Sequence, residues 1–173
     1  NTTVPGLNAL VKDGNFLLYY FDANSNNGDY GNNGTANAPN RVRIDRRGPV
    51  INFTNPINQS YTSSSNVTIK LYVTDEFSGV NASTANYSFD NSSWLPTSQS
   101  GDVFSALQVW DTTVYSNNQT VAVYAKATDL LGNTNYIYIN VIIDNEVPRL
   151  YISLPSANQT LYNNTLLLFT AED

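Results

Sequence analysis

The feature that most constrains this chain is a strict alternation of apolar and polar residues in short segments. In residues 66–74, "NVTIKLYVT", every second residue is apolar: Val67, Ile69, Leu71 and Val73. Because successive side chains of a β-strand point to opposite faces, this period of two predicts a half-buried strand with those four residues facing the core. No stretch of the chain has a convincing helical period.

Further segments have the same pattern and predict strands at residues 50–54, 85–90, 103–110 (with a kink or bulge), 121–127 and 136–143. The turn-forming sequences "FSG", "DNSS", "SNNQ" and "LLGN" separate them. Short strands at regular spacing predict an all-β fold, an immunoglobulin-like antiparallel β-sandwich. The residues expected to face its core are Ile51, Phe53, Tyr87, Phe89, Val121, Val123, Ala125, Ala127, Ile137, Ile139, Val141 and Ile143.

The chain also contains an internal repeat. Residues 48–76, which begin "GPVINFTNPINQS", reappear as residues 147–173, which begin "VPRLYISLPSANQT". Pro49 matches Pro148, and the segment before Pro49 resembles the segment before Pro148, with Asp22 in the place of Asp129. The repeat predicts tandem domains: residues 1–47 are the C-terminal half of a preceding domain, 48–146 a complete domain, and 147–173 the N-terminal strands of a following one.

Half a sandwich leaves strand edges and apolar faces open, so the two flanking parts need completion. One explanation is a longer tandem array within the same chain. The other is strand donation, in which the leading strands of one copy complete the trailing half of an identical subunit. The sequence leaves both open.

Asparagine is the most unusual component of the composition. Random placement of its residue types would give about five N-x-[ST] acceptor sites. The chain has eleven, which predicts heavy N-glycosylation on an extracellular protein. The acceptors are Asn1, Asn33, Asn52, Asn58, Asn66, Asn81, Asn86, Asn91, Asn118, Asn158 and Asn163.

The rest of the composition excludes several classes of protein. With no cysteine and no histidine, the chain lacks a disulfide framework, thiolate zinc sites and the usual general base. A net charge of −6 argues against nucleic acid as a partner, because phosphate binding needs a basic surface. No apolar run approaches the ~20 residues of a membrane span.

Several motifs together resemble the tandem bacterial and archaeal Ig-like (Big-type) repeats of cell-surface proteins. They are D-x-x-S-G-V at residues 75–80, "YSFDNSSW" at 87–94, "WDTT" at 110–113, "KATDLLGN" at 126–133 and the terminal "IDNEVP" at 143–148. The resemblance implies the fold and a tandem architecture. The density of acceptor sites and the low charge are more similar to an archaeal surface-layer-associated or filament protein. The long tip at residues 24–35 departs from the short turn of these repeats.

Candidate ligand chemistry is sparse, and we predict no bound metal. Oxygen-bearing side chains alternate at Asp22, Asn24, Asn26 and Asp29, but the spacing misses a calcium loop by one residue and lacks the closing glutamate. We expect turn and capping roles both for these side chains and for the junction carboxylates Asp75, Asp129, Asp144 and Glu146. The alternative is calcium, bound either at this loop or between domains by the junction carboxylates.

We expect no enzyme activity, because no nucleophile motif is present and the acids fall mainly in turns. Tyr72, Tyr136 and Tyr138 are predicted to face outward, either in cross-strand pairs or against a neighbouring subunit or glycan. The predicted function is a structural module of a secreted cell-surface glycoprotein: a stiff spacer, surface-layer or filament component. Its partners would be neighbouring Ig-like domains of the same chain or identical subunits. A donor-strand filament subunit and an adhesive or carbohydrate-binding module are the alternatives.

Overall fold

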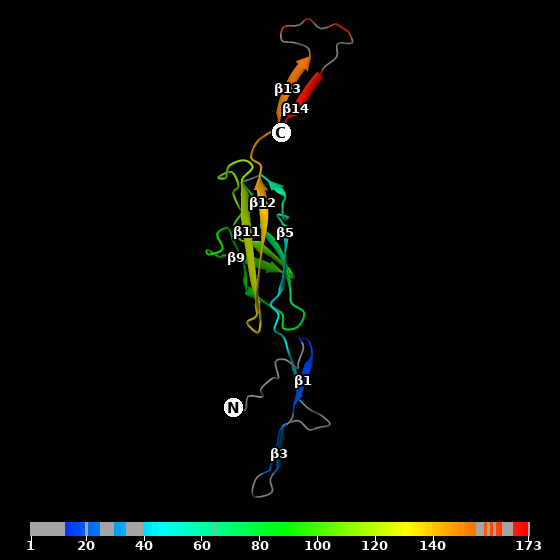
Figure 1. Ribbon diagram of the computed structural model, residues 1–173, viewed down its shortest axis with the longest axis vertical. Coiled ribbons are helices and arrows are strands. Elements are labelled where there is room, and N and C mark those ends of the chain that lie inside the picture. Colours follow the sequence, from blue (N-terminus) through cyan, green and yellow to red (C-terminus); the bar gives the residue numbers. More distant parts are fainter. Residues whose placement is uncertain are drawn as a thin grey trace.

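A computed structural model describes residues 13–19, 21–24, 30–33, 40–63, 65–154, 158, 160, 162–163 and 168–172. All regular structure in these ranges is β-strand (Figure 1). No helix within them is long and apolar enough to cross a membrane.

The centre of the chain is one curled eight-stranded sheet. Its strands follow the order β5-β7-β10-β9-β8-β11-β12-β6, and the pairs are antiparallel except for β12 with β6. Their bounds are β5 (Val50–Asn55), β6 (Tyr61–Thr62), β7 (Lys70–Thr74), β8 (Val80–Ser88), β9 (Leu95–Ser100), β10 (Val103–Ala106), β11 (Thr120–Asp129) and β12 (Thr134–Ile143).

The curl makes two layers. Strand β9 pairs with β10 on one side and with β8 on the other, and so joins the layer β5-β7-β10 to the layer β8-β11-β12. This strand order is that of the two sheets of an immunoglobulin-like sandwich. The predicted fold class is therefore confirmed.

The core lies between these layers and contains the residues that the alternation assigned to it. Ile69, Leu71, Val73, Val123, Ala125, Ala127, Val141 and Ile143 are all buried, and Tyr87, Phe104 and Trp110 fill the space between them. Phe53, Phe89 and Ile137 are partly buried and pack against this cluster. The period of two thus fixes which face of each long strand is apolar.

The strand predictions needed correction in three places. Of the predicted strand 66–74, β7 covers only Lys70–Thr74, and Val67 forms a separate bridge. Strand β8 begins at Val80, five residues before the predicted start, because its first half carries small and polar residues with no clear period. Strand β9, "LPTSQS", has no counterpart among the predicted strands. It lies where the sheet curls from one layer to the other and is mostly exposed, so its sequence lacks alternating apolar residues. The predicted kink after Val103 is present, since β10 ends at Ala106 and Trp110 forms a separate bridge with Val67.

Two-stranded pairs flank the centre. On the N-terminal side, β1 (Phe16–Tyr19) pairs with β4 (Asn40–Arg43), and β2 (Phe21–Asn24) pairs with β3 (Tyr30–Asn33). On the C-terminal side, β13 (Arg149–Leu154) pairs with β14 (Leu168–Glu172). Figure 1 shows β1 and β3 at one end of the sandwich and β13–β14 at the other.

The β13–β14 pair has the same local geometry as the β5–β7 pair. Both are antiparallel, and the register shifts between Phe53 and Asn55 in one and between Ile152 and Leu154 in the other. These positions correspond within the sequence repeat. The boundaries of the three predicted domains stay a prediction.

Candidate functional site

The turn after β7 is built around the carboxylate of Asp75. One oxygen, Oδ1, accepts hydrogen bonds from the backbone N–H groups of Phe77, Ser78 and Gly79 at 3.1, 2.8 and 2.7 Å. Gly79 has a φ of 84°, which a residue with a Cβ rarely adopts. The D-x-x-S-G motif is therefore a carboxylate-anchored turn.

The β11–β12 hairpin has a second turn of this kind. Asp129 Oδ1 accepts the backbone N–H groups of Leu131 and Asn133, both at 2.8 Å, and Oδ2 accepts the Asn133 side-chain amide at 2.6 Å. Gly132 has a φ of 94°. The capping role expected of Asp129 is confirmed, and the positive φ of Gly132 completes the turn.

These hydrogen bonds shift the acid–base equilibrium of the turn carboxylates. Burial alone would raise the pKa of Asp129, which is 1% exposed, but the hydrogen bonds from Asn133 and Leu131 outweigh it and hold the pKa below its ordinary value. Backbone and hydroxyl donors of Ser92, Ser93 and Ser88 lower the pKa of Asp90 strongly. Both carboxylates therefore stay ionised at neutral pH.

The hairpin also holds the linker that enters the sandwich, residues 44–49. The Asn133 side chain donates to the carbonyl of Asp45 at 3.3 Å, and the Asn135 side chain donates to the carbonyl of Pro49 at 3.0 Å. A Cβ at Gly48 would lie 2.6 Å from the backbone carbon of Thr134, so only glycine fits there. We call this set of contacts the linker clamp.

A second group of contacts joins the linker to the segment before β1. The Arg47 guanidinium donates to Asp13 at 3.2 Å, and Arg46 forms an ion pair with the same carboxylate at 3.8 Å. The Arg43 guanidinium lies 5.6 Å from the centre of the Phe77 ring, which belongs to the Asp75 turn. The segment before β1 is thus tied to the linker by ion pairs, and Arg43 of β4 contacts the Asp75 turn through the Phe77 ring.

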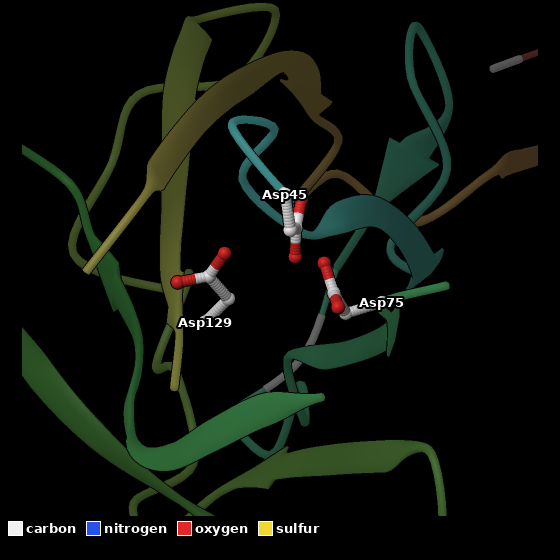
Figure 2. A group of neighbouring side chains, drawn as sticks. All are labelled: Asp45, Asp75 and Asp129. Atoms are coloured by element: carbon white, nitrogen blue, oxygen red, sulfur yellow. The ribbon is translucent and has the colours of Figure 1, made fainter. Parts of the chain in front are cut away.

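Three carboxylates meet at this joint (Figure 2). Asp45, Asp75 and Asp129 come from the linker and from the two anchored turns, and one ligand oxygen of each lies within 4.8 Å of the others. Asp45 Oδ2 is buried and has no hydrogen-bond donor. Within the described ranges these are the residues that could hold a metal ion, and their oxygen ligands suit a hard cation such as Ca²⁺.

The structure brings together only part of the predicted junction set. Asp75 and Asp129 meet, whereas Asp144 and Glu146 line a separate hollow with Tyr61, Asn117 and Asn118. The sequence analysis did not identify Asp45 as a site residue. The internal repeat did contain a signal for it, since Asp45 stands before Pro49 in the same position as Asp144 before Pro148.

The loop considered for calcium is only partly described. Asp22 and Asn24 belong to β2, while Asn26 and Asp29 lie outside the described residues.

The acceptor asparagines of the described part lie at or near the surface. Asn81 and Asn86 are half-buried, and the others whose exposure is described are exposed: Asn52, Asn58, Asn66, Asn91, Asn118, Asn158 and Asn163. Asn33 lies in β3, where its side chain is not described, and Asn1 lies outside the described residues. Glycosylation itself stays a prediction.

The outer face of β11 and β12 carries an aromatic cluster. Tyr124 lies directly opposite Tyr138 with ring centroids 5.7 Å apart, and Trp94 lies edge-on to Tyr136 at 6.1 Å. Lys126 Nζ lies 4.3 Å from the centre of the Trp94 ring. Tyr136 and Tyr138 are 60% and 63% exposed, as predicted for outward positions. These rings and Asn91 line an open hollow of about 580 Å³, which we call the aromatic hollow.

No protein-family model and no curated protein matches the chain. Among solved structures, fibronectin(III)-like modules of Clostridium thermocellum CbhA align with 72% of this chain at 15% identity and a TM-score of 0.44, and the alignment covers 63% of that chain. An engineered protein aligns with 55% of this chain at 22% identity and a TM-score of 0.40, over 20% of its own length.

The Asp129 turn predicts a specific dependence of stability on pH. The pKa of Asp129 is depressed in the folded state, so its contribution is present above the unfolded value of about 3.9 and is lost as the pH falls through the folded value. Asp129→Asn should lower the free energy of unfolding at pH 7 by about 1–3 kcal/mol, because an amide donor replaces the acceptor that Asn133 needs.

Urea unfolding at pH 7, 5, 4 and 3 measures this effect, with exposed Glu76→Gln as the control. The difference between wild type and Asp129→Asn should shrink below pH 4. A difference that is independent of pH would contradict the assigned role of Asp129.

The carboxylate cluster predicts that Asp45→Asn stabilises the protein when divalent cations are absent. The substitution removes one like charge and provides a donor beside Asp75 and Asp129, so we expect a gain of about 1 kcal/mol. Thermal unfolding in EDTA measures it, and a lower Tm for the variant would contradict the prediction. Adding Ca²⁺ to both proteins is the second arm: a Tm rise in wild type that Asp45→Asn lacks identifies bound cation.

Proposed function

We propose that this chain is a structural module of a secreted, N-glycosylated cell-surface protein, in which Ig-like domains in series act as a stiff spacer. The observation that carries the proposal is the linker clamp. Asn133 and Asn135 bind the carbonyls of Asp45 and Pro49, and the backbone of the hairpin excludes any side chain at Gly48. A linker whose carbonyls and dihedral angles are fixed in this way transmits orientation from one domain to the next.

The surface of the sandwich supports an extracellular location. Seven acceptor asparagines of the described part are exposed, as glycan attachment requires. The chain also has no cysteine, so its stability depends on the core and on the anchored turns and is independent of disulfides.

Four of the described carboxylates support a mechanical role for the turns that they belong to. Asp75, Asp90, Asp111 and Asp129 each accept hydrogen bonds from backbone amides of their own turns. A carboxylate that fixes a turn is not free to approach a substrate as a general acid or nucleophile. We therefore propose that the module holds other parts of a surface layer or filament at a set distance from the cell.

A second candidate function, a filament subunit joined by donated strands, is favoured by the flanking pairs. Both faces of the β13–β14 pair carry exposed apolar side chains: Leu150, Tyr151, Ile152, Leu168 and Phe169. The β1–β4 pair exposes Phe16, Leu18 and Val42. Such faces need further strands over them, either from the same polypeptide or from another copy.

The mass of the protein taken from its native cell surface separates these two functions. A spacer array predicts a polypeptide far longer than 173 residues after glycan removal, carrying many N-glycans before it. A donor-strand filament predicts a polypeptide of about this length in polymers that resist SDS. If the protein from the native cell surface carries no glycan at any acceptor site, N-glycosylation is contradicted for both proposed functions.

The linker clamp predicts a change in proteolysis of the full chain. Gly48→Ala should raise the rate of tryptic cleavage after Arg46 and Arg47 by about tenfold, because the added Cβ pushes the linker off the hairpin and increases its open population. Cleavage after Arg149, the first residue of β13, is the internal reference. Equal rates in variant and wild type would show that the clamp does not hold the linker.

A further inference from the structure

The aromatic hollow has an acceptor asparagine in its wall. Asn91 begins the sequence Asn91-Ser92-Ser93 and lines the same hollow as Trp94, Tyr136 and Tyr138. Asn118, for comparison, faces a hollow whose other residues are Asn117, Asp144, Glu146 and one tyrosine.

The turn that presents Asn91 is held by its neighbour Asp90. The Asp90 carboxylate accepts the N–H groups of Ser92 and Ser93 at 2.8 and 2.7 Å and the Ser93 hydroxyl at 2.7 Å. Asn91 itself is exposed and has a φ of 58°, a conformation that asparagine tolerates well. The turn is therefore organised by Asp90, which leaves the Asn91 amide available at the rim of the hollow.

We propose that Asn91 carries an N-linked oligosaccharide whose first sugar rings lie in the aromatic hollow, packed on Trp94, Tyr136 and Tyr138. This proposal rests on the proposed function in one respect: the chain must be exposed to enzymes that attach N-linked glycans. It names one of the acceptors as a site where the glycan is part of the packed structure.

The chemistry of the two surfaces is complementary. A pyranose ring has faces of C–H groups and a rim of hydroxyls, and exposed tyrosines offer a flat apolar ring with a hydroxyl at its end. The hollow of about 580 Å³ lies within the ~300–1,000 Å³ range of sites that hold small molecules. Tyr136 and Tyr138, at 60% and 63% exposure, otherwise leave large aromatic surfaces in water.

The covalent link makes the attached glycan the favoured occupant. A sugar tethered at the rim has a high effective concentration in the hollow, so contacts too weak for a free saccharide are enough to hold it. A free oligosaccharide or a second copy of the chain would have to meet the same surface from solution. Both are distinguished in the experiment below.

The experiment uses acrylamide quenching of tryptophan fluorescence in the glycosylated full chain. Of the two tryptophans, Trp110 is 5% exposed, so quenching reports mainly on half-buried Trp94. The variant Asn91→Asp removes only the glycan in question, and Asn118→Asp is the matched control because Asn118 is also an exposed acceptor with a positive φ, 61°. An amidase that releases N-glycans leaves aspartate, so enzymatic removal gives the same residue as the variant.

We expect the quenching constant to rise about twofold in Asn91→Asp and to stay at the wild-type value in Asn118→Asp. After enzymatic removal of all glycans the three proteins should be indistinguishable. In the full chain carrying Tyr138→Thr, which alters an exposed strand position, the effect of removing the Asn91 glycan should be smaller than in wild type. Site-resolved mass spectrometry supplies the occupancy at Asn91 and at the other acceptors.

Five results would overturn the proposal. Occupied acceptors elsewhere with an empty Asn91 would overturn it and leave the proposed function intact, whereas no occupied acceptor at all would overturn both. An occupied Asn91 whose removal leaves quenching unchanged would mean that the glycan extends into solvent. Quenching protection that appears only on adding free oligosaccharide, or only with rising protein concentration, would assign the hollow to a soluble carbohydrate or to a second copy.

Discussion

The carboxylate of Asp129 is the interaction on which the joint depends. It fixes the hairpin between β11 and β12 through two backbone amides, and it orients the side chain of Asn133. Asn133 in turn holds the carbonyl of Asp45, so a buried acid within the sandwich determines where the preceding segment enters. Since Asp129 is buried, its hydrogen bonds are protected from competition with water.

The same device recurs around the sandwich. Asp75, Asp90 and Asp111 each close a turn by accepting the amides that follow them. Four of the five sequence motifs that resemble tandem surface repeats are, in physical terms, these carboxylate-anchored turns. They leave the outer sheet faces free for other uses, and the aromatic hollow beside Asn91 lies on one of those faces. A fold held by its core and its turns tolerates changes on that surface.

The alternation of apolar residues predicted strands β7, β11 and β12 and their buried faces, because each has one side on the core. It could not predict β9, whose residues lie at the edge between the layers with little apolar burial. The cluster at the joint was half predicted. Asp75 and Asp129 stood out by their turn motifs, but only the fold places the linker residue Asp45 against them.

The central claim is that the linker clamp makes the N-terminal segment and the sandwich move as one body. Backbone ¹⁵N relaxation of the full chain tests it most directly, by comparing the rotational correlation time of amides in β4 with that of amides in β11. We expect a single correlation time for both strands in wild type and separate values in Asn133→Ala, which loses the contact to Asp45. A shorter correlation time for β4 already in wild type would contradict the account.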